Sequence, residues 1–284
     1  MRRGEPVNIG IRLHDTLPGT LNERLCYAQS QGFTCAHLAL SKTIAGFDME
    51  KAPVLLTDAL AEEVRCAFAA RRMQCAVLGC YLNLADPDPE GMARTQEIYK
   101  AHLRFAPKMG ALMVGTETYA NAASRFPEGP GASEEAFQLF LKGLRPVVRC
   151  AEECGAILAV EPVSSHIIAT PERAQRMLEE VPSENLKIIL DAVNLLTVEN
   201  AGQANAIVED AISRLGDKII MLHMKDYELR PGQVFSKACG TGDMSFERLL
   251  SFAKTRALPM TLEDTLPDNA EAARLHLEKV AAGL

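Results

Sequence analysis

Four potential metal ligands lie at the carboxyl ends of four successive apolar runs: Glu161, Asp191, His223 and Glu263. Neighbouring members of the set are 30, 32 and 40 residues apart, the spacing of one strand–helix unit, so a parallel sheet would bring all four to one edge. Three carboxylates packed together repel one another unless a cation compensates them. Three oxygen ligands and one nitrogen ligand favour Mn²⁺, Mg²⁺ or Co²⁺, with Zn²⁺ as an alternative.

A single carboxylate at the end of a strand more often caps a helix or forms an ion pair than binds a metal. That interpretation is harder to apply to acidic and imidazole side chains at the ends of four consecutive strands. The pattern therefore predicts a site for one divalent metal ion.

Short apolar runs alternate with amphipathic stretches along the whole chain. The runs, too continuous for half-solvated antiparallel strands, are Val7–Leu13, Thr34–Leu40, Cys75–Leu82, Ala111–Thr116, Ala156–Val160, Lys187–Leu190, Lys218–His223 and Pro259–Leu262. The amphipathic stretches are Leu21–Gln31, Thr57–Met73, Gly91–Met109, Ser133–Cys154, Thr170–Val181, Ala204–Leu215, Ser245–Arg256 and Asp268–Ala282. Eight such units, about 35 residues each, predict an α/β protein with a closed (β/α)8 TIM barrel.

An open, doubly wound sheet is the structural alternative. Such a sheet usually has a glycine-rich turn after its first strand, and the first run here, Ile9-Gly10-Ile11-Arg12, lacks one. No low-complexity linker or shift in composition marks a second domain. We therefore expect residues 1–284 to form a single TIM-barrel domain, with helix N-caps at Thr170, Ser133 and Ser245.

Composition excludes several classes of function. Lys and Arg number 30 against 37 Asp and Glu, a net charge of −7, which argues against a broad nucleic-acid footprint. The longest uncharged run near the middle, Met73–Ala85, is too short to span a bilayer, and no signal peptide follows Met1-Arg2-Arg3. The eight cysteines include no Cys-x-x-Cys pair, so we expect buried, reduced thiols and a cytoplasmic location.

Seven motifs, in this order along nearly the whole chain, resemble a known family. They are Val77–Asn83, Val114–Thr118, Val160–Pro162, Leu190–Asn194, His223–Asp226, Gly240–Asp243 and Leu262–Glu263. The chain resembles the xylose-isomerase-like barrels of the sugar phosphate isomerase/epimerase family, which include ketose epimerases related to D-tagatose 3-epimerase. The resemblance implies a small carbohydrate substrate and one divalent ion held by Glu161, Asp191, His223 and Glu263. It also implies association, most simply as a homodimer.

Glu161 and Glu263 are the catalytic acid/base residues that the resemblance implies. A metal that grips a ketone and its neighbouring hydroxyl stabilises a cis-enediolate, and a carboxylate transfers the proton. Two bases on opposite faces would give epimerisation, and one base that moves a proton between adjacent carbons would give isomerisation. The sequence does not choose between them, and dehydration of a keto-cyclitol such as an inosose is the strongest alternative.

Two other functions are open to such a barrel. An abasic-site endonuclease would need several zinc ions, hence more histidines at strand ends, and a basic rim, and this chain has six histidines and a net charge of −7. A non-catalytic sugar-binding barrel is the second, and the complete ligand set argues against it.

The family's epimerases usually carry a histidine where this chain has Asn194, and their substrate-binding arginine has no clear counterpart here, Arg230 being the nearest.

Further side chains near strand ends are candidates for contact with substrate: Glu117, His166, Asn194, Lys225, Tyr81, Asn83 and His14. Glu117 could equally support the metal ligands, and Asp226 is expected to anchor a neighbouring segment. His37 and His102 are interpreted as structural. The Gly240-Thr241-Gly242 segment is interpreted as a turn, because a lone Gly-x-Gly is weak evidence for a phosphate site.

The long connection Tyr227–Asp243 contains Pro231-Gly232 and is expected to fold partly over the barrel mouth as a lid.

Overall fold

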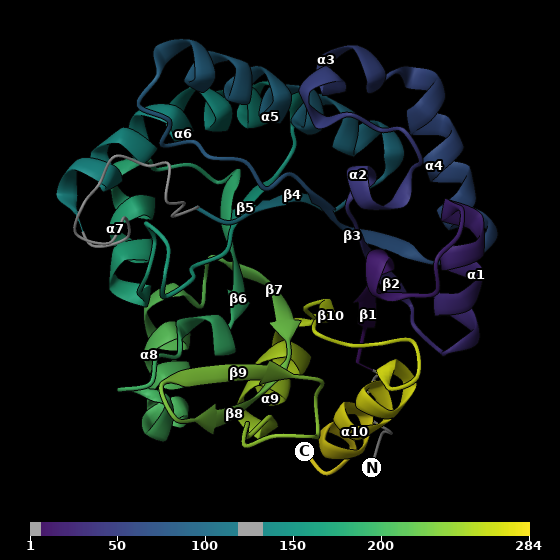
Figure 1. Cartoon of the computed structure of the whole chain (residues 1–284), viewed down its shortest axis with the longest axis vertical. Helices are drawn as coiled ribbons and strands as arrows, with labels where there is room; N and C mark the ends of the chain where they lie inside the picture. Colours follow the sequence, from purple (N-terminus) through teal and green to yellow (C-terminus); the bar gives the residue numbers. More distant parts are fainter. Residues whose placement is uncertain (1–6, 119–132) are drawn as a thin grey trace.

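Eight parallel strands close into a barrel in the computed structural model, which describes residues 7–118 and 133–284 (Figure 1). Around the barrel the strand order is β1-β10-β7-β6-β5-β4-β3-β2. The strands are β1 (Ile9–Arg12), β2 (Cys35–Leu38), β3 (Gln74–Gly79), β4 (Met113–Thr116), β5 (Leu158–Val160), β6 (Leu186–Asp191), β7 (Ile219–Met224) and β10 (Met260–Leu262). The predicted α/β class and closed (β/α)8 barrel are confirmed.

Helices surround the barrel on the outside (Figure 1). They are α1 (Leu21–Ser30), α2 (Leu40–Thr43), α3 (Ala52–Leu55), α4 (Asp58–Ala70), α5 (Pro89–Met109), α6 (Glu134–Cys154), α7 (Pro171–Glu180), α8 (Ala204–Leu215), α9 (Glu247–Arg256) and α10 (Ala270–Ala282). The side chains of Ser133 and Thr170 cap α6 and α7, as predicted. Ser245 caps no helix, because α9 begins at Glu247 and has Phe246 at its N-cap.

The barrel interior is packed with apolar side chains from strands β2 to β7. This inner cluster comprises Cys35, Ala76, Val77, Met113, Ala159, Ile189 and Met221. At Gly115 in β4 a Cβ atom would lie 2.6 Å from Val77 Cγ1 and 3.1 Å from Ile189 Cδ1, so the interior leaves no room for a side chain there. The intervening strand residues, such as Leu78 and Leu190, belong to the larger core between the strands and the helices.

Two parts of the chain depart from the simple alternation. Between β2 and β3, the short helices α2 and α3 precede the predicted helix. After β7, residues Asp226–Arg230 and Gln233–Lys237 form the antiparallel hairpin β8–β9, where a loop was expected. Its strands are mostly polar and outward-facing, so they lack the apolar run that marks the barrel strands.

Asp226 holds the base of this hairpin, as the sequence suggested. Its carboxylate accepts hydrogen bonds from five backbone N–H groups at 2.8–3.1 Å, those of Tyr227, Gly240, Thr241, Gly242 and Met244. The backbone of Gly240-Thr241-Gly242 is therefore engaged by a carboxylate of the protein itself, and the interpretation of this segment as a turn is confirmed.

The hairpin does not act as a lid in this structure. The Tyr227 hydroxyl donates to the carbonyl of Ala201, just before α8, so the hairpin packs beside that helix (Figure 1). None of residues 227–243 lines the cavity at the barrel mouth. Asp226 and Tyr227 hold the hairpin beside the barrel in this structure, and closure of the hairpin over the mouth stays a prediction.

Within residues 7–118 and 133–284, none of the helices is both long and apolar enough to cross a membrane. All eight cysteines are free thiols, and most are buried as expected, but Cys26 and Cys66 are exposed.

Candidate metal centre and adjoining cavity

The four predicted ligands meet at the carboxyl ends of neighbouring barrel strands. Glu161 follows β5, Asp191 ends β6, His223 lies near the end of β7, and Glu263 follows β10. Strand register places Asp191 directly opposite His223. The exposed fractions of the four residues are 1%, 1%, 1% and 6%, and one candidate ligand atom from each lies within 4.8 Å of the others. The sequence spacing thus translates into one buried cluster.

In Glu161 and Asp191, one carboxylate oxygen is held by protein donors and the other is directed into the cluster. Glu161 Oε1 accepts from the Asn194 side chain at 2.6 Å, and Glu161 Oε2 lies 2.9 Å from His223 Nδ1. Asp191 Oδ1 accepts from the backbone N–H groups of Val193 and Asn194 at 2.9 and 3.1 Å. Outer partners of this kind orient a carboxylate toward an ion.

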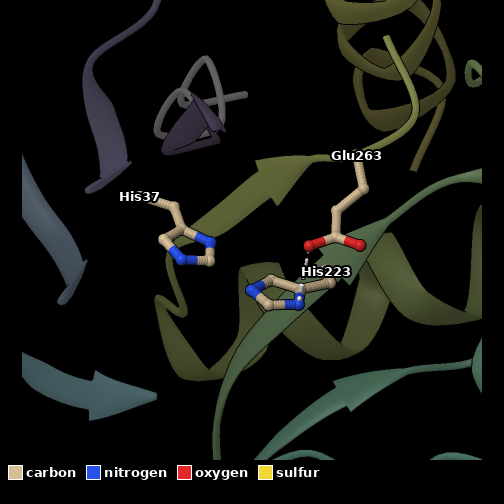
Figure 2. Close-up of side chains that lie close together, drawn as sticks. All are labelled: His37, His223 and Glu263. Atoms are coloured by element: carbon tan, nitrogen blue, oxygen red, sulfur yellow. Dashed lines mark ion pairs between the residues drawn. The ribbon is translucent and has the colours of Figure 1, made fainter. Parts of the chain in front are cut away.

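The two carboxylate oxygens of Glu263 also face different partners. Its Oε1 lies 3.2 Å from His223 Nδ1, the ion pair drawn in Figure 2. Its Oε2 lies 3.3 Å from an Arg12 guanidinium nitrogen and 3.5 Å from Lys225 Nζ. Each of the three carboxylates therefore keeps one oxygen on the side of the cluster.

Three buried atoms of the set lack a hydrogen bond. Within the described residues, His223 Nδ1, His223 Nε2 and Asp191 Oδ2 have no hydrogen-bond partner, although charged atoms lie 2.9–3.2 Å from His223 Nδ1 and Asp191 Oδ2. Those neighbours are close enough for attraction but are not aligned for hydrogen bonds. A cation between the ligand atoms would satisfy Asp191 Oδ2 and one ring nitrogen of His223, because it needs no donor hydrogen. The donor set and these buried atoms together fit a divalent metal ion.

Basic side chains counter the three carboxylates. Burial alone would lower the pKa of His223, but Glu161 and Glu263 raise it to about 9. Burial likewise opposes the charge on Lys225, and Asp191 and Glu263 raise its pKa above the usual value. Burial raises the pKa of Asp191 to about 6 even though Lys225 acts in the opposite direction. The charges of the three carboxylates and of the basic side chains around them thus set one another's protonation.

A cavity of about 530 Å³ opens beside the cluster. Its lining residues are Arg12, His14, His37, Ala39, Ser41, Lys42, Met49, Gly79, Tyr81, Leu82, Glu117, His166 and Glu263. Glu263 is the one member of the four-residue set in this lining. A ligand in the cavity would therefore meet the cluster from the side of Glu263.

Four of the seven predicted substrate contacts line the cavity: His14, Tyr81, Glu117 and His166. The polar side chains of the other three are used elsewhere. Asn194 holds Glu161, Lys225 lies on the carboxylates, and the Asn83 side-chain oxygen accepts from the backbone N–H of Ala85 at 2.8 Å. These protein partners explain why the three side chains do not line the cavity. The sequence pattern does not reveal such partners.

Glu117 and His166 lie together on the cavity wall. Glu117 Oε2 is 3.6 Å from His166 Nδ1. Burial, with the charges of Glu161 and Glu263, raises the pKa of Glu117 to about 7. Burial lowers the pKa of His166. Glu117 is therefore a cavity carboxyl group that can carry a proton near neutral pH.

The interpretation of His37 as purely structural is incomplete, because His37 lines the cavity. Its ring stacks on that of His223 (Figure 2), with centroids 5.7 Å apart and planes 12° apart. Its Nε2 lies 3.3 Å from the Tyr81 hydroxyl. His37, His223 and Glu263 also form a second group with metal-ligand spacing. The sequence analysis missed His37 because it extended the second strand to Leu40, whereas β2 ends at Leu38.

Arg12 is the second residue that the sequence analysis missed. It ends β1, whereas the predicted run continued to Leu13, so its position at a strand end was hidden. Its guanidinium group contacts Asp15 at 2.8 Å, Asp264 at 3.3 Å and Glu263 at 3.3 Å. Arg12 thereby links the end of β1 and Asp15 to Glu263 and Asp264 in the loop after β10.

A family model described as Xylose isomerase-like TIM barrel matches residues 27–280. The chain belongs to this family. No curated protein matches the sequence.

Several solved structures share the fold of this chain at low sequence identity. The 3-keto-D-glucoside 4-epimerase YcjR of E. coli has a TM-score of 0.75 and 18% identity, over 96% of this chain and 99% of that one. The D-psicose 3-epimerase of Clostridium cellulolyticum H10 has a TM-score of 0.71 and 15% identity, over 98% and 96%. The IolI protein, solved with a zinc atom, has a TM-score of 0.70 and 18% identity, over 98% and 97%.

Proposed function

We propose that the protein is a divalent-metal-dependent isomerase or epimerase that acts on a sugar, a keto-sugar or a sugar phosphate through a cis-enediolate. The observation that carries the proposal is the buried set of four ligand atoms within 4.8 Å of one another, beside a cavity of about 530 Å³. Membership of the xylose isomerase-like family supports it, as do the epimerase activities named for two of the similar structures.

Proton removal from a carbon beside a carbonyl requires stabilisation of the negative charge that develops on oxygen. A divalent ion held by Glu161, Asp191, His223 and Glu263 would supply this as a Lewis acid at the carbonyl and the neighbouring hydroxyl. The oxygen-rich donor set favours Mn²⁺, Mg²⁺ or Co²⁺. Zn²⁺ is the alternative, and the zinc atom in IolI supports keeping it.

Glu263 and Glu161 are the residues we assign to proton transfer. Glu263 lines the cavity, whereas Glu161 is 1% exposed and does not line it. Burial alone would raise the pKa of Glu263, but the charges of His223, Lys225 and Arg12 hold it below its usual range. Glu263 is therefore ionised at neutral pH and able to accept a proton. Use of both carboxylates on opposite faces gives epimerisation, and use of one gives isomerisation.

The cavity walls supply the groups that orient the substrate. His14, Tyr81, Glu117 and His166 remain proposed contacts, and His37 and Arg12 join them because they line the same cavity. Direct contact is not proposed for Asn83, Asn194 and Lys225, whose polar atoms bind protein partners. Burial, with the nearby charge of Lys42, lowers the pKa of His14 to about 3, so at neutral pH its ring is uncharged.

Exchange of carbon-bound hydrogen with solvent tests the proposal. Ketoses, ketose phosphates and inososes are incubated in D₂O with the Mn²⁺-loaded protein, and deuterium incorporation is followed by NMR and mass spectrometry. At least one ketose or ketose phosphate should gain deuterium at the carbon beside its carbonyl. His223→Ala should lose Mn²⁺ and exchange together. Glu263→Gln should keep Mn²⁺ and lose exchange, whereas the control Glu184→Gln, on the surface, should retain both.

Two results would contradict the proposal. Loss of water from an inosose, with no exchange into ketoses, would show the dehydratase. Sugar binding without exchange into any member of the panel would show a binding barrel.

A further inference from the structure

Lys225 lies directly on the candidate metal ligands. Its Nζ is 3.1 Å from Asp191 Oδ2 and 3.5 Å from Glu263 Oε2. The residue is 7% exposed and is absent from the cavity lining, so its ammonium group faces the carboxylates and not a ligand in the cavity. A buried positive charge in contact with two candidate ligands must affect the binding of a cation between them.

Asp191 has one oxygen to offer an ion. Its Oδ1 already accepts two backbone hydrogen bonds, from Val193 and Asn194, which use both of its lone pairs. Its Oδ2 is buried and makes no hydrogen bond within the described chain, and this is the atom beside Lys225 Nζ. An ion bound by Asp191 would therefore have to share Oδ2 with the ammonium group or displace it.

Lys225 directly follows β7, which ends at Met224. Met224 packs into the hydrophobic core, whereas His223 and Lys225, two residues apart, both contact the carboxylates of the cluster. The extended chain that directs His223 into the cluster therefore also directs residue 225 there. A lysine in this place puts a positive charge where a cation must enter.

A third acceptor for Lys225 lies just outside the cluster. Asp264 Oδ2 is 3.9 Å from Lys225 Nζ, and the Asp264 side chain is 36% exposed. A small movement would transfer the ammonium group from Asp191 to Asp264, away from the cluster, without leaving it unpaired.

We propose that Lys225 is a built-in competitor of the metal: its ammonium group occupies Asp191 Oδ2 and Glu263 Oε2 when no ion is bound, and moves to Asp264 when an ion binds. The inference rests on the proposed metal site. Two positive charges a few ångströms apart in a buried site repel strongly, so Lys225 lowers the affinity for the ion. The same charge compensates the buried acids without an ion, so the metal-free protein stays folded and the ion exchanges readily.

Four variants test this. Lys225→Met keeps most of the unbranched side chain and removes its charge. Asp264→Asn removes the negative charge of the second acceptor and keeps the backbone, since Asp264 has φ 52° and Asn adopts this left-handed conformation readily. The double variant reports whether Asp264 acts through Lys225. Lys218→Met is the matched control, because Lys218 immediately precedes β7, at the opposite end of that strand, and pairs with Glu184.

The measurements are Mn²⁺ affinity, by calorimetry on chelator-stripped protein, and thermal unfolding with and without Mn²⁺. Lys225→Met should lower the Kd about tenfold or more. It should also lower the melting temperature of the metal-free protein and enlarge the increase that Mn²⁺ causes. Asp264→Asn should raise the Kd, and this effect should shrink in the Lys225→Met background. If Lys225→Met does not fold without metal, competition of the Mn²⁺-loaded protein against a chelator gives its Kd.

An unchanged or higher Kd in Lys225→Met, while wild type binds Mn²⁺, would overturn this inference and leave the proposed function standing. An Asp264→Asn effect of equal size in both backgrounds would overturn the transfer to Asp264. Absence of Mn²⁺ binding by wild type would instead overturn the proposed metal site itself.

Discussion

The Asn194 side chain donates a hydrogen bond of 2.6 Å to Glu161 Oε1, and so turns the other oxygen of Glu161 toward His223. Its backbone N–H meanwhile donates to Asp191 Oδ1 at 3.1 Å. One residue therefore orients two of the four proposed ligands. Asn194 is thus engaged, through its side chain and its backbone, with the candidate metal ligands.

Asn194→Ala should weaken Mn²⁺ binding about 10- to 100-fold, because Glu161 loses the donor that orients it, while the backbone hydrogen bond to Asp191 remains. Calorimetric titration checks this. Asn200→Ala is a control, since the Asn200 side chain contacts the backbone of residues 195 and 197 and no proposed ligand. Equal Kd values for Asn194→Ala and wild type would show that the hydrogen bond does not support the ion.

Gly79→Ala should weaken substrate binding, because the added Cβ atom of alanine would lie 2.7 Å from both His37 Nε2 and a Tyr81 ring carbon. One of these cavity side chains would have to move. The expected result is a KM several-fold higher with Mn²⁺ affinity nearly unchanged. Gly202→Ala is the matched control, since nothing lies within 4 Å of its added methyl group. A KM equal to that of wild type would argue that His37 and Tyr81 do not shape the binding site.

Asp226→Asn should destabilise the fold by about 3 kcal/mol or more, because five backbone N–H groups converge on this carboxylate and an amide replaces one acceptor oxygen by a donor. Denaturant unfolding measures the change. Asp243→Asn, an exposed aspartate in the same loop, should change stability by less than about 0.5 kcal/mol. Similar losses of stability in both variants would show that the five hydrogen bonds to Asp226 do not stabilise the fold.

His102 should make stability depend on pH. Its Nδ1 lies 2.8 Å from the Ile98 carbonyl, and burial lowers its pKa from 6.5 to about 4. Below pH 6.5 the unfolded chain binds a proton that the folded protein rejects. Stability is therefore present above pH 6.5 and is lost as the pH falls toward 4, by up to about 3 kcal/mol. His102→Asn, whose amide can donate to Ile98, should show a smaller decrease than wild type between pH 7 and 4. Parallel stability curves would contradict the assignment.

The sequence predicts the barrel and the convergence of Glu161, Asp191, His223 and Glu263, because parallel strands must end at one edge and each run ends in an obvious polar residue. It fails at Arg12 and His37, where the apolar runs continue one or two residues past the strands. It does not show the hairpin β8–β9, whose strands are polar, or the protein partners of Asn83, Asn194 and Lys225. Position at a strand end identifies these three as candidates, but only the packed structure shows which protein atoms they bind.

The central claim is that Glu161, Asp191, His223 and Glu263 hold one divalent ion. A crystal structure of the protein with Mn²⁺, using anomalous diffraction to locate the metal, tests this most directly. The account predicts one peak about 2.0–2.4 Å from His223 Nδ1 and from an oxygen of each carboxylate, including Asp191 Oδ2. A structure with any two of the four side chains turned away from the ion, or with no peak among them, would contradict the metal site and the isomerase or epimerase built on it.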